Sequence, residues 1–106
     1  MTVITIGRTG ITARGHAGDG TSKLGTQTCA SISTLMALIA QYLYNEKSEN
    51  IIHIDLQEGK ADINYKAPDK VIDSMTEGFY LIEDASSPDN IRVIPDYDTY
   101  ERMKKS

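Results

Sequence analysis

The sequence has one cysteine, few aromatic residues and no long apolar run. An unpaired cysteine excludes a disulfide framework and is typical of proteins from reducing compartments, so we expect a cytoplasmic protein. No stretch approaches the ~20 apolar residues that a membrane-spanning helix needs. The segment from Met1 to Arg8 also lacks the basic start and continuous apolar run of a secretory signal. We therefore expect no membrane association.

Positive charge is scarce as well. Eleven Lys and Arg residues stand against 15 Asp and Glu residues, which gives a net charge of -4. Affinity for nucleic acids depends on basic side chains gathered against phosphates, so this balance disfavours direct nucleic-acid binding. The length of 106 residues, with 40% hydrophobic and 25% charged residues, is ordinary for one soluble globular domain. The expected partner is a protein or peptide.

Hydrophobic periodicity predicts an α+β fold. Alternation indicates a hairpin of strands 3–7 and 11–15, and a second hairpin that turns at Glu58-Gly59. Helical spacing indicates one helix from about Thr28 to Asn45 and another that begins near Pro68. A short strand over 91–94 and a polar C-terminal tail over 95–106 follow. The predicted order is ββαββαβ, a two-layer sandwich in which a mostly antiparallel sheet carries both helices on one face.

Cys29 is placed by this pattern in the first turn of a helix, capped by Thr26 or Thr28. A thiol attacks only as the thiolate, and an unperturbed cysteine, with a pKa near ~8.5, is only a few per cent ionised at neutral pH. The helix dipole lowers that pKa by less than roughly one unit. A neighbouring imidazolium supplies a larger shift, so His16 is the candidate partner of Cys29.

The two side chains meet only if the backbone bends. Strict alternation points His16 away from the face that carries Ile11 and Ala13, which is the face that the helices cover. Gly15 permits a bend at that point. Between the two candidates, small polar residues and glycines form a segment that can open for a substrate. This predicted substrate loop comprises Gly18, Asp19, Gly20, Gly25 and Thr26.

Two interpretations of Cys29 remain open on the residues alone. A lone cysteine on an amphipathic helix is often a small core side chain, and the helix has an apolar face with Ile32, Met36 and Ile39. The glycine-rich segment and the position at a helix start favour a nucleophile instead. A metal site is disfavoured, because no ligand pair has the close spacing of zinc sites and His53 alternates outward in a strand. No cofactor is expected.

Gly15-His16-Ala17, a loop and then Cys29-Ala30-Ser31-Ile32-Ser33 resemble the signature of the ribosomal-processing cysteine protease family Prp. The likeness extends from Thr2 to about Ile94 and includes Gly78-Phe79, Pro88 and Ile91-Arg92-Val93. It implies that Cys29 is the nucleophile, that His16 is its general base and acid, and that the protein is a homodimer. The expected substrate by resemblance is the N-terminal extension of large-subunit ribosomal protein 27, cut after an aromatic or other apolar residue.

The remaining candidate positions support this dyad. We expect the Cys29 N–H and the adjacent amides of the helix start to form the oxyanion site. Gly15, Ala30 and Ser33 are expected as supporting residues by resemblance. Ser33 has an alternative role, in which its hydroxyl bonds the carbonyl four residues earlier in the helix.

The chain also departs from the family pattern. The family usually has an acidic residue three places before the cysteine, whereas Thr26-Gln27-Thr28 stand there in this chain, and the loop is one residue longer. This departure favours one alternative, a non-catalytic protein-binding module of the same fold. A further alternative is a Prp-like protease that acts on phage capsid or scaffold precursors.

Overall fold

Alternating apolar residues form the first hairpin, close to where the sequence predicts it. The computed structural model describes residues 1–17 and 22–105, in which β1 spans Thr2–Ile6 and β2 spans Gly10–Arg14. The two strands pair antiparallel, with Ile6 opposite Ile11. Their isoleucines are buried, so one face of this hairpin belongs to the core.

Three further strands complete a five-stranded sheet in the order β3-β4-β2-β1-β5. They are β3 (Ile51–Gln57, preceded by the short 3-10 helix η1 at Ser48–Asn50), β4 (Lys60–Tyr65) and β5 (Ile91–Pro95). Every neighbouring pair is antiparallel except β1 and β5, which run parallel. The predicted α+β class with a mostly antiparallel sheet is confirmed.

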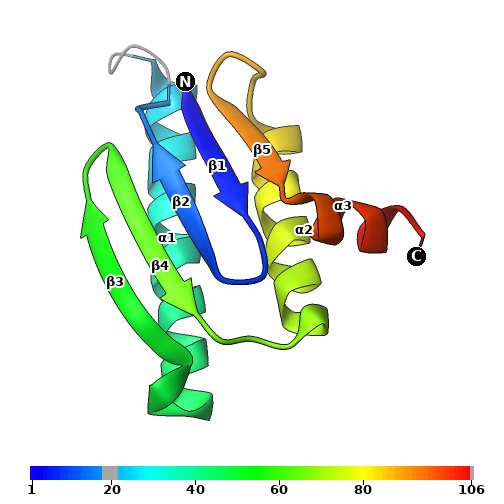
Figure 1. The fold of residues 1–106 in the computed structure, drawn as a ribbon. Coiled ribbons are helices and arrows are strands. Elements are labelled where there is room, and N and C mark those ends of the chain that lie inside the picture. The colour runs from blue at the N-terminus through cyan, green and yellow to red at the C-terminus, as the bar shows by residue number, and fades with distance from the viewer. Residues whose placement is uncertain (18–21, 106) are drawn as a thin grey trace.

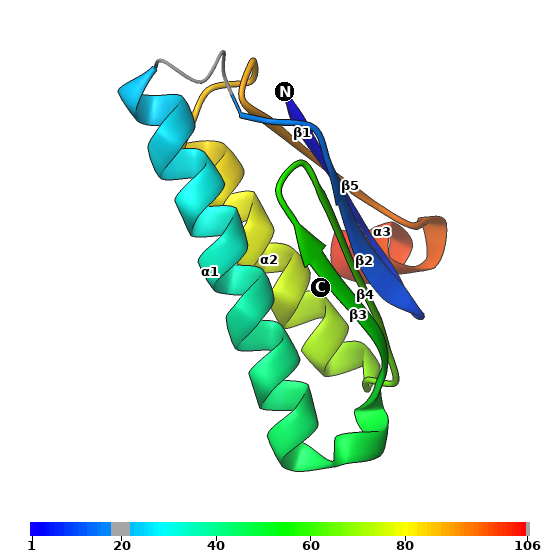
Figure 2. The same ribbon diagram turned by 90° about the vertical axis from the view of Figure 1, so that its left-hand side faces the viewer.

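Two long helices, α1 (Lys23–Glu46) and α2 (Asp69–Ala85), cover one face of the sheet, as Figures 1 and 2 show. The core lies between these helices and the strands. Its large buried side chains include Met36 and Leu43 of α1, Ile72 and Phe79 of α2, and Tyr65 of β4. Within the described part of the chain, no helix is long and apolar enough to span a membrane.

The start of α1 corrects the sequence prediction. The helix begins at Lys23 rather than Thr28, and Ser22 caps it by accepting a hydrogen bond from the Gly25 N–H at 3.1 Å. Thr26 and Thr28 are therefore helical residues and not the cap. Hydrophobic spacing did not predict the early turns, because their buried positions are occupied by Gly25 and Thr28 and not by large apolar residues.

The segment 95–106, expected as a polar tail, contains the short helix α3 (Tyr97–Lys104). Asp96 caps α3 by accepting the Thr99 N–H at 2.8 Å. Arg102 of α3 then donates one bifurcated hydrogen bond from Nε, and another bond from Nη2, to the carboxylate of Asp73 on α2, at 2.6–3.0 Å. The helix is held by a cap and an ion pair rather than by an apolar stripe, which is why hydrophobic spacing did not predict it.

Candidate active site

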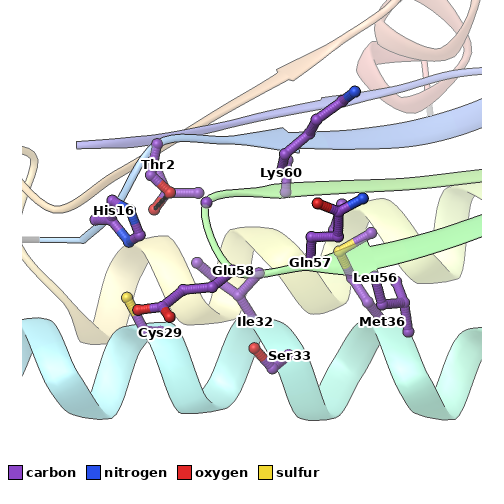
Figure 3. A pocket seen from close by; sticks show the side chains of 14 residues that line it. Thr2, His16, Cys29, Ile32, Ser33, Met36, Leu56, Gln57, Glu58 and Lys60 are labelled. Atoms are coloured by element: carbon purple, nitrogen blue, oxygen red, sulfur yellow. Dashed lines mark hydrogen bonds between the residues drawn. The ribbon is translucent and has the colours of Figure 1, made fainter.

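Gly15 turns the chain toward the helices, as the sequence predicts. Its φ of 91° lies in the region that glycine adopts readily, and a Cβ there would clash with the carbonyl oxygen of Met1. The Gly15 N–H donates to the carbonyl of Gly59 at 2.9 Å, which ties the end of β2 to the β3–β4 turn. His16 follows directly, and its side chain points toward the α1 side of the cleft (Figure 3).

Cys29 lies in the second turn of α1 and not in the first, because α1 begins at Lys23. The dipole effect falls off within the first turn, so it aids the thiolate less than expected. The Cys29 N–H also lies beyond the unpaired amides of a helix start. The predicted oxyanion site at the helix start is therefore wrong.

A backbone amide outside the helix contacts the sulfur instead. The Ala17 N–H donates to Cys29 Sγ at 3.3 Å, and Ala17 is 2% exposed. The Cys29 thiol also lies 4.0 Å from the Ala17 carbonyl oxygen, to which it can donate. The sequence analysis missed this role of Ala17, although the residue belongs to the Gly-His-Ala segment that carried the resemblance.

His16 and Cys29 line the same open cleft, of about 350 Å³. The cleft has two ends (Figure 3): His16 and Cys29 lie at one, and Met36 and Leu56 lie at the other. Its volume lies within the usual range of ligand pockets. The lining residues are Thr2, Ala13, Gly15, His16, Cys29, Ile32, Ser33, Met36, Leu56, Gln57, Glu58, Gly59, Lys60 and Ala61.

The structure separates the predicted supporting residues. Gly15 and Ser33 line the cleft, whereas Ala30 is exposed in a shallow groove between α1 and α2. Gly25 and Thr26, predicted in the substrate loop, belong to α1 instead. Gly18, Asp19 and Gly20 lie outside the described residues, so the rest of that loop stays a prediction.

The wall opposite α1 was not predicted as part of the site. It comes from the end of β3, the turn and the start of β4, and it brings Leu56, Glu58 and Gly59 to the cleft. The Glu58-Gly59 pair signals a turn, but sequence spacing alone does not show which part of the chain that turn contacts. The bond from Gly15 to Gly59 is what sets it beside His16.

The nearest strongly paired charges face the other side of the sheet. Arg14 Nη1 lies 2.8 Å from Asp62 Oδ1. The hydrogen bond from Arg14, opposed in part by burial, lowers the pKa of the Asp62 carboxyl. Arg14 precedes Gly15 directly, and this pairing holds its charge on the face opposite the helices. Among the described residues, no group of three or more His, Cys, Asp or Glu is arranged to hold a metal ion.

Comparison with solved structures identifies similar folds. The ribosomal processing protease Prp from S. aureus, in complex with a substrate peptide, superposes with a TM-score of 0.72 at 18% identity over 91% of this chain and 100% of that chain. The same protease with a covalently linked product peptide gives 0.69 at 19% identity, with the same coverage of both chains. SMU.848 from Streptococcus mutans gives 0.65 at 18% identity over 89% of this chain and 90% of that chain.

No protein-family model and no curated protein matches the chain. At these identities the structural likeness shows the fold. The resemblance to Prp inferred from the sequence is thus confirmed at the level of the fold, over nine-tenths of the chain.

Proposed function

We propose that this protein is a cysteine endopeptidase in which Cys29 is the nucleophile and His16 is its general base and acid. The observation that carries the proposal is the convergence of His16 and Cys29, from separate elements, on one cleft where the sulfur also accepts the Ala17 N–H. A structural cysteine needs neither an imidazole nor an open cleft. The likeness to a protease fold supports the same proposal.

The reaction follows from these groups. The Cys29 thiolate bonds to the carbonyl carbon of the scissile peptide, and the imidazolium of His16 gives its proton to the leaving amine as the C–N bond breaks. Water then attacks the thioester and passes a proton to His16. The carboxylic acid leaves, and the thiolate–imidazolium pair is restored.

The proposed substrate is a protein precursor with an N-terminal extension, by resemblance large-subunit ribosomal protein 27. The similar S. aureus structures hold a substrate peptide and a product peptide, which favours a peptide ligand here. The apolar end of the cleft, with Ile32, Met36 and Leu56, suits an apolar side chain next to the cleaved bond. We also propose that the protein acts in the cytoplasm as a homodimer.

Replacement of the nucleophile tests the proposal. Cys29→Ala should abolish cleavage of the precursor and leave the circular dichroism spectrum unchanged, because the side chain is small and only half-buried. New termini are detected by mass spectrometry after incubation with the ribosomal precursor. Ser31→Ala, which changes an exposed position of the same helix, is the matched control and should cleave normally. Cleavage by Cys29→Ala at the parental rate contradicts the mechanism.

The imidazole is tested without any substrate. If His16 stabilises the thiolate, His16→Ala should slow alkylation of Cys29 by iodoacetamide much more near pH 6 than near pH 9, where the thiol ionises unaided. The rates follow from the mass of the alkylated protein against time. Equal effects at both pH values would make His16 a structural residue.

A second candidate is a binding module that recognises a protein segment without cutting it. The observation that favours it is the Thr26-Gln27-Thr28 segment, where the family usually has an acidic residue. The incubation separates the two: the module would retain the precursor intact, and the protease would release new termini. A phage capsid or scaffold precursor offered in parallel tests the remaining substrate class.

A further inference from the structure

In the part of the chain that the structure describes, the cleft that holds His16 and Cys29 contains one carboxylate, which comes from neither β2 nor α1. Glu58 lies in the turn between β3 and β4 and lines the cleft. Figure 3 shows its side chain extending from the turn in the direction of Cys29, below the ring of His16. A carboxylate three residues before the cysteine is absent from this chain, where Thr26 stands.

The turn that carries Glu58 is fixed against His16. The Gly59 carbonyl accepts the Gly15 N–H at 2.9 Å. A Cβ on Gly59 would stand 2.9 Å from His16 Nε2 and 3.1 Å from Cε1, so the backbone of the turn contacts the ring. Glu58 is the residue before this contact, and rotation of its own side chain is enough to change its distance from the ring.

Among the described residues that line the cleft, Glu58 is the one carboxylate beside His16. The ionisable residues that line the cleft are His16, Cys29, Glu58 and Lys60. The Lys60 ammonium points away from the cleft (Figure 3), and the Arg14 guanidinium is paired with Asp62.

We propose that Glu58 is a positioning residue for His16, whose carboxylate pairs with the imidazolium that forms when Cys29 is a thiolate. This inference rests on the proposed function of His16. The pairing stabilises the charged ring and orients it toward the sulfur. It supplies, from the β3–β4 turn, the carboxylate that is missing before the cysteine.

The pairing is tested by the titration of His16, followed by NMR in a Cys29→Ala background so that no thiolate contributes. Glu58→Gln should move the His16 titration to lower pH, because it removes a negative charge from a partly solvated cleft. Glu58→Asp keeps the charge and should restore much of the shift. His53, the other histidine, titrates as the internal reference on the opposite face. Glu77→Gln, on the exposed side of α2, is the control for net charge.

An unchanged His16 pKa in Glu58→Gln would overturn the proposal, whatever the protein's activity. In the cleavage assay, Glu58→Gln should lower kcat more than it changes KM and move the alkaline limb of the kcat/KM profile to lower pH. A raised KM with an unchanged pH profile would instead place Glu58 on the substrate and overturn positioning. If the His16 pKa falls as expected but no variant cleaves any precursor, the pairing stands and the protease proposal fails.

Discussion

At the scale of residues, two glycines hold the imidazole in place. Gly15 and Gly59 have φ angles of 91° and 77°, and the described residues include no other with a positive φ. They are joined by a hydrogen bond between their backbones. His16 follows the first, and its exposed ring lies beside the second.

Gly59→Ala should therefore damage both stability and activity. The new methyl group would contact the His16 ring, and the left-handed backbone conformation at this position costs an alanine roughly 1–2 kcal/mol. We expect the free energy of unfolding to fall by about that amount and cleavage to be slower. Urea unfolding and the cleavage assay measure the two effects. Gly78→Ala is the matched control, because in α2 the added Cβ meets only the flexible Leu35 side chain, at 3.3 Å. That variant should keep its activity, and its free energy of unfolding should rise by up to about 1 kcal/mol.

The candidate pair was accessible from the sequence because it lies in two short segments of recognisable composition. The rest of the cleft was not. The contact of the Ala17 N–H with sulfur depends on a backbone bend of a few residues, and the position of Glu58 depends on a hydrogen bond between Gly15 and Gly59, far apart in the chain. Hydrophobic periodicity predicts neither contact, because it indicates which side chains are buried and not where the backbone bends.

At the scale of elements, α3 depends on its cap. Asp96 accepts the N–H groups of Thr99 and Arg8, so one carboxylate joins the start of α3 to the β1–β2 turn. Burial raises the pKa of Asp96, but these amides and the Thr99 hydroxyl together hold it below its ordinary value. The ionised cap is thus the form that the fold favours.

Asp96→Ala should destabilise the protein by about 1 kcal/mol at pH 7, as for other caps. Because the folded-state pKa is depressed, the stabilisation is present above the unfolded value of about 4 and is lost as the pH falls through the folded value. The deficit of the variant should consequently shrink near pH 2.5. Denaturant unfolding at both pH values measures it, and an equal deficit at each would contradict the role of the charge.

Most of the elements were predicted, and besides α3 two exceptions are instructive. Ile52, Ile54 and Leu56 alternate with polar residues along β3, yet these side chains are 61%, 44% and 47% exposed. Leu56 faces the open cleft, and Ile52 lies at the register irregularity between Ile51 and His53. The other exception is α1. The exposed face of its first turn is polar, and Gly25 occupies the buried position of that turn.

At the scale of the whole molecule, the sheet brings together segments that are distant in sequence. The two hairpins follow from local pattern, but the pairing of β2 with β4, and of β1 with β5, is set by the helices that connect them. The preferences for right-handed connections and for two packed layers limit the possible connections, but they do not select one strand order. The class of the fold could therefore be predicted, whereas the order of the strands could not.

The parallel pairing of β1 with β5 has a consequence for the order of assembly during synthesis. Thr2 donates its N–H to Asn90, and β1 gains its second neighbour only when residues 91–95 have left the ribosome. Bringing β1 and β5 together closes a long loop, which costs chain entropy before the contacts between the two strands stabilise the structure. His16 and Cys29 are made early, yet the cleft between them, which includes Thr2 of β1, is completed late. For most of its synthesis, a nascent chain would therefore contain His16 and Cys29 without a complete cleft between them.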